Sequence, residues 1–124
     1  MNIPEDLLYT THDEWVRVDG DVITIGITEY AQDQLGELVH VELPAVGDAF
    51  EAGAAVAEVE SVKAVAEIFT PFTGEVVEVN DELDGAAERI NEDPYGSWIF
   101  RLRAADADTA ELLSPAAYLD QIEG

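Results

Sequence analysis

The sequence predicts one mainly β domain, a sandwich of sheets with short helices at its edges, and three observations support this. Residues 15–27 contain two β-rich runs around a turn signal. Small or apolar side chains occupy every second position in residues 55–59 and again in 64–68, which is typical of half-buried strands. Gly47-Asp48 and Gly74-Glu75 stand on either side of this pair, as in a pseudo-symmetric sandwich. The 124 residues are enough for one domain, 1–124, and too few for two.

The first predicted element is a hairpin, because Asp19-Gly20 readily takes the positive φ values of a tight turn. Thr28 is then placed to cap a short helix that runs through Leu35, and Gly36 is placed as the left-handed residue that ends it. A strand over residues 37–43, which ends at a proline, follows.

The middle of the chain predicts two strands that meet at Lys63. The two period-two runs flank Ser61, Val62 and Lys63, so the lysine falls in the connecting turn. Pro71 and Gly74 close this hairpin, and residues 75–80 form another short strand.

The last third of the chain predicts a loop, a strand and two helical segments. A loop that contains Asn91 and residues 94–96 leads into a strand over residues 98–103. Asp108 with Glu111 forms a capping box, and Ser114-Pro115 repeats the helix-start signal. We expect these helical segments to pack back on the sheet and cover part of it.

The charge of the chain is extreme. Asp and Glu total 28 against five basic residues, a formal net charge of -23. Nucleic-acid binding is excluded because phosphates need clustered Lys and Arg, and anionic membranes are disfavoured for the same reason. Two interpretations remain, a surface adapted to high salt and an acidic face for basic partners. The carboxylates are spread from Glu5 to Glu123 without a long block, which favours the first.

Cysteine is absent, which excludes disulfides, thiolate catalysis and zinc–thiolate sites. The N-terminus lacks a basic stretch followed by an apolar one, and no apolar run approaches the roughly 20 residues of a membrane helix. We therefore expect a soluble, cytoplasmic protein. We also expect the protein to be a monomer.

Lysine occurs once in the sequence, at position 63. One interpretation is that this lysine merely solubilises a turn. Catalysis by the free amine is disfavoured, because water and the nearby Glu60 and Glu67 keep an ammonium charged. An exposed turn instead offers access to a modifying enzyme, which could convert the ammonium into an amide that carries a long arm.

Residues 60–64, Glu-Ser-Val-Lys-Ala, resemble the lipoylation site of glycine cleavage system H proteins. The similarity extends in order, and at family spacing, from about Tyr9 to Tyr118. It is carried by further segments: Glu14-Trp15-Val16, residues 25–36, Val41–Pro44 with Val46-Gly47, residues 71–80 and residues 94–98. The lysine motif alone is moderately specific for the family, whereas all of these segments together, in this order, are strong evidence of the resemblance.

This resemblance implies a barrel-sandwich hybrid fold like that of lipoyl domains, with lipoate attached covalently to Lys63. It implies a shuttle that is not itself an enzyme. An aminomethyl group is loaded by a pyridoxal-phosphate glycine decarboxylase (P protein) and passed to a tetrahydrofolate-dependent aminomethyltransferase (T protein). A flavin dihydrolipoamide dehydrogenase (L protein) then reoxidises the arm. A lipoate ligase or lipoyl transferase attaches the cofactor, and residues Glu60, Ser61, Val62 and Ala64 form the turn that it recognises.

The resemblance also implies contacts for the loaded amine. In the family an acidic residue before the tryptophan and another four residues after the lysine receive it, here Glu14 and Glu67. A partly dry cleft would protect this amine from water. The chain departs from the family at Gln34, where histidine is common, and at Asp13, where the histidine is shifted to His12.

Several alternatives compete with this interpretation. A carrier domain of 2-oxoacid dehydrogenases shares the sandwich and the lysine, but usually has flexible tethers that this chain lacks. A biotin carrier would place Met beside the lysine. A lipoyl relay would pass its group to other enzymes. An acidic interaction domain would leave Lys63 unmodified, and the carboxylates are too dispersed to single out an enzymatic pair.

Overall fold

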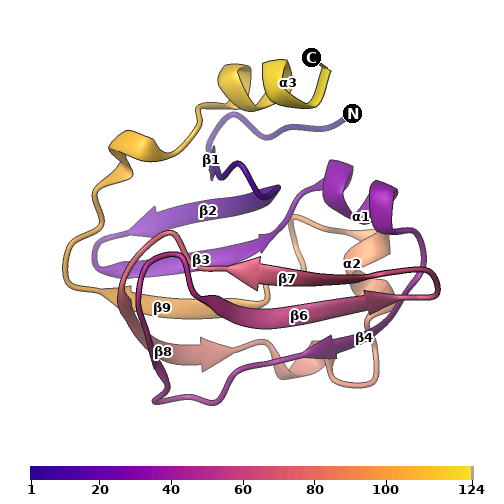
Figure 1. Cartoon of the computed structure of the whole chain (residues 1–124), viewed down its shortest axis with the longest axis horizontal. Coiled ribbons are helices and arrows are strands. Elements are labelled where there is room, and N and C mark those ends of the chain that lie inside the picture. The colour runs from indigo at the N-terminus through magenta and orange to yellow at the C-terminus, as the bar shows by residue number, and fades with distance from the viewer. Residues whose placement is uncertain (124) are drawn as a thin grey trace.

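The computed structural model describes residues 1–123 as two antiparallel sheets that face each other, with short helices at the edges (Figure 1). The first sheet has six strands in the order β1-β2-β3-β9-β8-β5: Leu8–Tyr9, Glu14–Asp19, Val22–Ile27, Phe100–Ala104, Gly74–Val79 and Ala49–Phe50. The second has three, β4-β6-β7: Leu38–Glu42, Ala55–Ser61 and Val65–Phe69. The helices are α1 (Glu29–Leu35), α2 (Glu88–Glu92) and α3 (Pro115–Glu123), with 3-10 turns η1 (Asp81–Leu83) and η2 (Thr109–Glu111). The predicted mainly β class is confirmed.

The core lies between the two sheets and is built from their inward side chains. Ile25 of β3, Leu102 of β9 and Val59 of β6 are fully buried in one cluster. The predicted alternation holds at Ala57, Val59, Ala66 and Ile68, but fails at Ala55 and Ala64, which are exposed. A register shift between Ala55 and Ala57 places Val56 inward instead, and Ala64 belongs to the turn. Bulges of this kind break a period of two locally.

The N-terminal hairpin and the helix after it form as predicted, with one shift. Asp19 pairs with Val22, so the turn residues are Gly20 and Asp21 rather than Asp19 and Gly20. Gly20 has φ +65°, which suits glycine at the first turn position. In α1, Thr28 Oγ1 accepts a hydrogen bond from the Ala31 backbone N–H, as expected of the cap.

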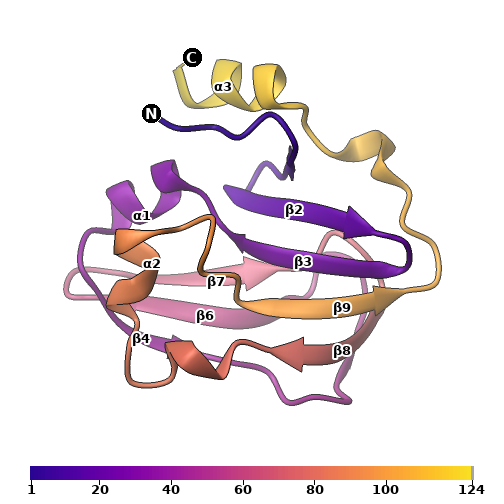
Figure 2. The same cartoon turned by 180° about the vertical axis from the view of Figure 1, so that it is seen from behind.

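The C-terminal helix covers the N-terminal end of the fold (Figures 1 and 2). Tyr118 of α3 is fully buried and stacks on Tyr9 with ring centroids 4.7 Å apart. Its hydroxyl lies 2.7 Å from Thr28 Oγ1 and donates to Asp13 Oδ1 at 3.0 Å. This confirms that the C-terminal segment packs back on the sheet. The Asp108 start signal produces the single 3-10 turn η2 rather than an α-helix.

Other sequence-based expectations were wrong in detail. Asn91 lies in helix α2 and not in a loop, and the strand expected from Trp98 begins at Phe100. The two-residue strands β1 and β5 were missed. Within residues 1–123, none of the helices reaches the length and apolar character of a membrane-crossing segment.

The two tryptophans, Trp15 and Trp98, differ in their surroundings. Trp15 is fully buried, and its Nε1 donates to the Pro94 carbonyl oxygen at 3.0 Å. It lies over Gly26, where an added Cβ would stand 2.5 Å from the ring. Trp98 is half-buried, and the Arg101 guanidinium lies 3.9 Å from its ring centroid. Trp98 is therefore partly a surface residue.

Candidate functional site

The lysine turn joins β6 and β7 at one end of the three-stranded sheet, beside the chain that leads from α1 to β4 (Figure 1). Ser61 holds the turn closed. Its Oγ accepts from the Lys63 N–H at 3.2 Å and the Ala64 N–H at 3.0 Å, and its own N–H donates to the Ala64 carbonyl at 2.8 Å. A serine that binds backbone groups in this way rigidifies a turn. Ser61 is therefore the residue that shapes this turn.

The residues around this serine present Lys63 to solvent. Lys63 and Ala64 are exposed, and Val62 is 72% exposed. Glu60 is half-buried and pairs across the sheet with His40 on one side and Val65 on the other. Neither of the two ion pairs found within residues 1–123 involves Lys63. The lysine thus stands at the apex of a rigid turn, as the sequence predicted.

The turn rests on the segment that connects α1 to β4. The Glu37 carbonyl accepts from the Val62 N–H at 3.3 Å, and Ser61 pairs with Leu38. Gly36 has φ +81°, and a Cβ placed there would lie 3.6 Å from Lys63 Cε. The lysine side chain therefore runs against Gly36. From the sequence, Gly36 was predicted only to end the helix, and its contact with Lys63 was not expected.

Glu14 is a buried carboxylate at the start of β2, only 1% exposed. Its Oε1 accepts from the Thr10 hydroxyl at 2.7 Å, and its Oε2 accepts from the Phe69 N–H at 2.8 Å. Burial raises the pKa of Glu14 to about 7, although both hydrogen bonds favour the charged form and limit the rise. With a pKa of about 7, Glu14 is only partly ionised at neutral pH, and a cation bound beside it would favour the ionised form.

A cavity of about 360 Å³ lies against Glu14. Thr10, His12 and Phe69 contribute to its wall, together with Phe72 and Leu112. The His12 ring packs on the Phe69 ring with centroids 4.7 Å apart. The wall thus combines a buried carboxylate with apolar and aromatic side chains, which suits a ligand that has an apolar chain and a positive end.

Glu67 lies elsewhere. It is exposed on β7, opposite Glu58 of β6, and lines a separate depression with Glu42 and Glu58. The structure does not bring the side chains of Glu14 and Glu67 into one cavity. The reason is that Glu14 meets β7 through the Phe69 backbone at the strand edge, whereas the Glu67 side chain projects from the sheet face.

The residues that depart from the family pattern have identifiable places. Asp13 has φ +67°, and its carbonyl accepts from the Thr28 N–H at 3.1 Å. Aspartate is one of the few residues that tolerate this backbone conformation. Gln34 and His12 are exposed.

The chemistry available at the lysine turn is acylation of an exposed primary amine. Within residues 1–123, no group of three metal-ligating side chains was found. The turn leaves the amine accessible and places Val62 beside it, which fits a covalently attached group such as lipoate.

Comparisons with known proteins point to one family. The family model described as Glycine cleavage H-protein matches residues 7–123. A "Glycine cleavage system H protein" from Thermus thermophilus is 50% identical in an alignment of 125 positions that covers 99% of this chain and 98% of that protein. One from Rubrobacter xylanophilus is 48% identical over 122 residues, with 98% and 95% covered.

A solved structure is similar as well. The crystal structure of a glycine cleavage system H protein from Mycobacterium marinum matches with a TM-score of 0.90 and 36% identity. The match covers 98% of this chain and 100% of that chain. It confirms the barrel-sandwich hybrid expected from the resemblance.

Proposed function

Because the chain belongs to the glycine cleavage H-protein family, we propose that Lys63 is the residue to which its lipoate is attached. The protein is a lipoyl-carrying shuttle of the glycine cleavage system, which interacts with the P, T and L proteins and is not a catalyst. Lysine occurs once in the sequence, and this observation carries the assignment to Lys63. The rigid, exposed turn around it supports the proposal.

Lys63 would hold lipoate through an amide bond, and the bound group would supply a redox-active dithiolane able to carry an aminomethyl group between the partner proteins. The chain itself supplies the anchor, since a tethered group reaches its partners at an effective concentration of order mM. The recognition turn formed by Glu60, Ser61, Val62 and Ala64 serves a lipoate ligase or lipoyl transferase in this proposal. Ser61 has the clearest role there, because it fixes the backbone on both sides of the anchor.

We propose that Glu14 receives the positive end of the loaded arm. β7 is an edge strand of its sheet, and it leads from the lysine turn to Phe69, whose N–H meets the Glu14 carboxylate. From Val65 to Phe69 this strand covers about 13 Å at the usual rise per residue. The cavity beside Glu14 provides walls that exclude water from such a ligand. Glu67 remains a predicted amine contact, but its separate depression makes Glu14 the stronger candidate.

The attachment site can be tested with purified protein. Incubation with a lipoate ligase, lipoate and ATP is expected to add one lipoyl group, found by peptide mapping on the peptide that contains Lys63. The turn presents the amine to solvent, so the reaction should occur in the folded protein. A folded chain that a competent ligase leaves unmodified, while the ligase modifies a known H protein in parallel, contradicts the proposal.

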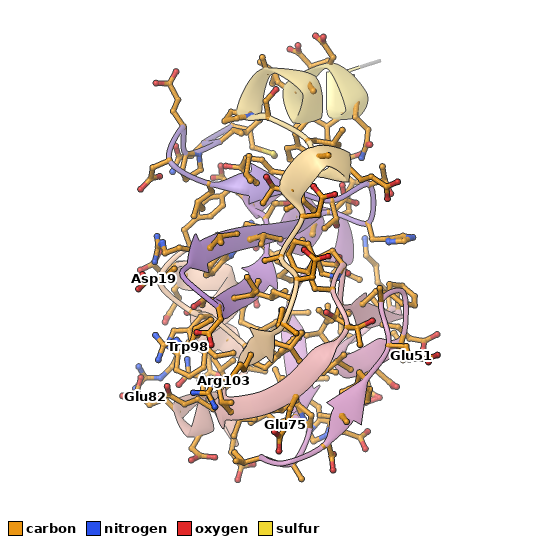
Figure 3. All side chains as sticks on the ribbon, turned by 90° about the vertical axis from the view of Figure 1, so that its left-hand side faces the viewer. Asp19, Glu51, Glu75, Glu82, Trp98 and Arg103 are labelled. Carbon is orange, nitrogen blue, oxygen red and sulfur yellow. The ribbon has the colours of Figure 1, made fainter. Side chains whose placement is uncertain are left out.

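We further propose that the acidic surface is an adaptation to high salt and that the protein is a cytoplasmic monomer. The labelled carboxylates Asp19, Glu51, Glu75 and Glu82 lie well apart from one another in the view of Figure 3. Glu42, Glu58 and Glu67 stand directly opposite one another on adjacent strands, and like charges so placed destabilise a sheet. The charge of -23 also opposes association of copies, and the absence of cysteine suits a reducing compartment.

This adaptation predicts that the unfolding temperature rises with KCl. We expect a clear rise between about 0.01 M and about 1 M, where the Debye length falls from about 30 Å to about 3 Å. Glu58→Gln, at the centre of the carboxylate row, should reduce the salt dependence more than Glu51→Gln outside it. Light scattering in the same series should give the mass of one chain. A salt-independent unfolding temperature would rule out the adaptation.

A further inference from the structure

Asn91 of α2 connects three parts of the fold through its side chain. Its Oδ1 accepts from the Leu38 N–H at 2.9 Å, and its Nδ2 donates to the Gly36 carbonyl at 2.8 Å and to Gln32 Oε1 at 2.9 Å. These bonds span 53 to 59 positions in the sequence. One half-buried amide thereby links the end of α1 to the beginning of β4.

The linked segment is the one that supports the lysine turn. Glu37, between the two backbone partners of Asn91, accepts from the Val62 N–H. Gly36 lies against the Lys63 side chain, and Leu38 pairs with Ser61. Asn91 does not contact the turn itself. It can affect Lys63 only through residues 36–38.

Helix α1 depends on such a link. It has seven residues, and none of them is fully buried. A helix this short is not stable by itself and must be held by tertiary contacts. Ala31 and Leu35 pack against the core but are only partly buried, and the Asn91 amide adds hydrogen bonds to Gln32 and Gly36.

Only a primary amide fits this position. The site needs one acceptor for the Leu38 N–H and two donors for the oxygens of Gly36 and Gln32, which is the inventory of an asparagine side chain. Aspartate would supply the acceptor but would place a carboxylate against two oxygens. A hydrocarbon side chain would leave the Leu38 N–H and the Gly36 carbonyl without the hydrogen bonds that Asn91 makes to them.

We propose that Asn91 is a positioning residue for the lipoyl-lysine turn. It fixes residues 36–38, and through them it sets the direction in which the Lys63 side chain leaves the turn. The enzyme that lipoylates the protein then meets the amine in one orientation. This inference rests on the proposed function of Lys63, but its structural part can be measured without any lipoylation.

The test compares Asn91→Ala with Asn80→Ala. Asn80 is a matched control, because its amide also bonds backbone groups, the Trp98 carbonyl and the Glu82 N–H, but no atom of α1, β4 or the turn. Asn91→Ala removes all three hydrogen bonds of the Asn91 side chain, and native-state hydrogen exchange at the Leu38 and Val62 N–H groups should become at least about tenfold faster. Exchange at these two groups should be unchanged in Asn80→Ala.

Lipoylation kinetics provide the second readout. Asn91→Ala should raise the KM of a lipoate ligase for the protein about tenfold while kcat stays near that of the wild type. Gln32→Ala removes one of the three bonds and should give a smaller change of the same kind, which keeps the test available if Asn91→Ala does not fold. Unchanged exchange at Val62, or an equal effect of Asn80→Ala, overturns the inference. Failure of the wild type to be lipoylated would instead reject the role of Lys63.

Discussion

Lys63→Arg is expected to abolish glycine cleavage activity completely while leaving the fold intact. Arginine keeps the positive charge of the exposed turn but cannot form the amide that holds lipoate. The side chain takes no part in the core or in either ion pair of residues 1–123, so the free energy of unfolding should change by no more than about 0.5 kcal/mol. Exchange of labelled bicarbonate into glycine with the P protein measures the activity.

The control for this prediction is Arg17→Lys, which creates a second lysine on β2. It should be lipoylated at Lys63 and retain the exchange activity, because Arg17 lies outside the recognition turn. Exchange activity that survives in Lys63→Arg would show that the shuttle does not depend on this residue.

Glu14→Gln is expected to leave lipoylation intact but to shorten the lifetime of the aminomethyl-loaded protein about tenfold, since the buried amine would lose its counter-charge. Glutamine preserves the size of the side chain and its acceptor for the Phe69 N–H. Decay of the loaded form, followed by the release of the one-carbon unit, measures the lifetime. Glu75→Gln serves as the control, because Glu75 is exposed and does not line the cavity.

The same substitution should change the pH dependence of stability without any cofactor. The folded-state pKa of Glu14, about 7, lies above its ordinary value of 4.5. The folded protein therefore keeps a proton that the unfolded chain releases, and the free energy of unfolding falls as the pH rises from about 4.5 to about 7. Below about pH 4.5 Glu14 is protonated in both the folded and the unfolded state, so this loss of stability is absent there. Urea unfolding should show this fall in the wild type and a smaller one in Glu14→Gln.

A loaded lifetime equal to that of the wild type would eliminate Glu14 as the amine contact, whatever the pH profile shows. A parallel measurement on Glu67→Gln identifies the alternative. A short lifetime in that variant alone would place the amine at the depression shared with Glu58.

Much of the fold followed from local signals. The Thr28 cap and the strands on either side of Lys63 depend on residues within a few positions, and they form as predicted. Helix α2 was missed because Asn91 and Pro94 were interpreted as loop residues. The run Ala86–Glu92, which includes α2, contains good helix formers such as Ala86, Ala87 and Glu88, and this signal could have revealed the helix. The strands β1 and β5 are too short for any period to appear.

The candidate site divides in the same way. Lys63 could be found from the single lysine in the composition and from the turn pattern around it, since both are read directly from the sequence. The state of Glu14 could not, because its burial depends on Phe69, 55 positions away. The structure shows that Glu14 is not a solvated strand end, since its side chain is only 1% exposed. The support given to the turn by Gly36 and Asn91 likewise comes from contacts between distant segments.

The most direct test of the central claim is the mass of the protein taken from cells that make it naturally. We predict a fraction that is heavier by one lipoyl group, with the added mass on the peptide that contains Lys63. A chain that carries no adduct in cells growing on glycine, or an adduct on another residue, would contradict the account.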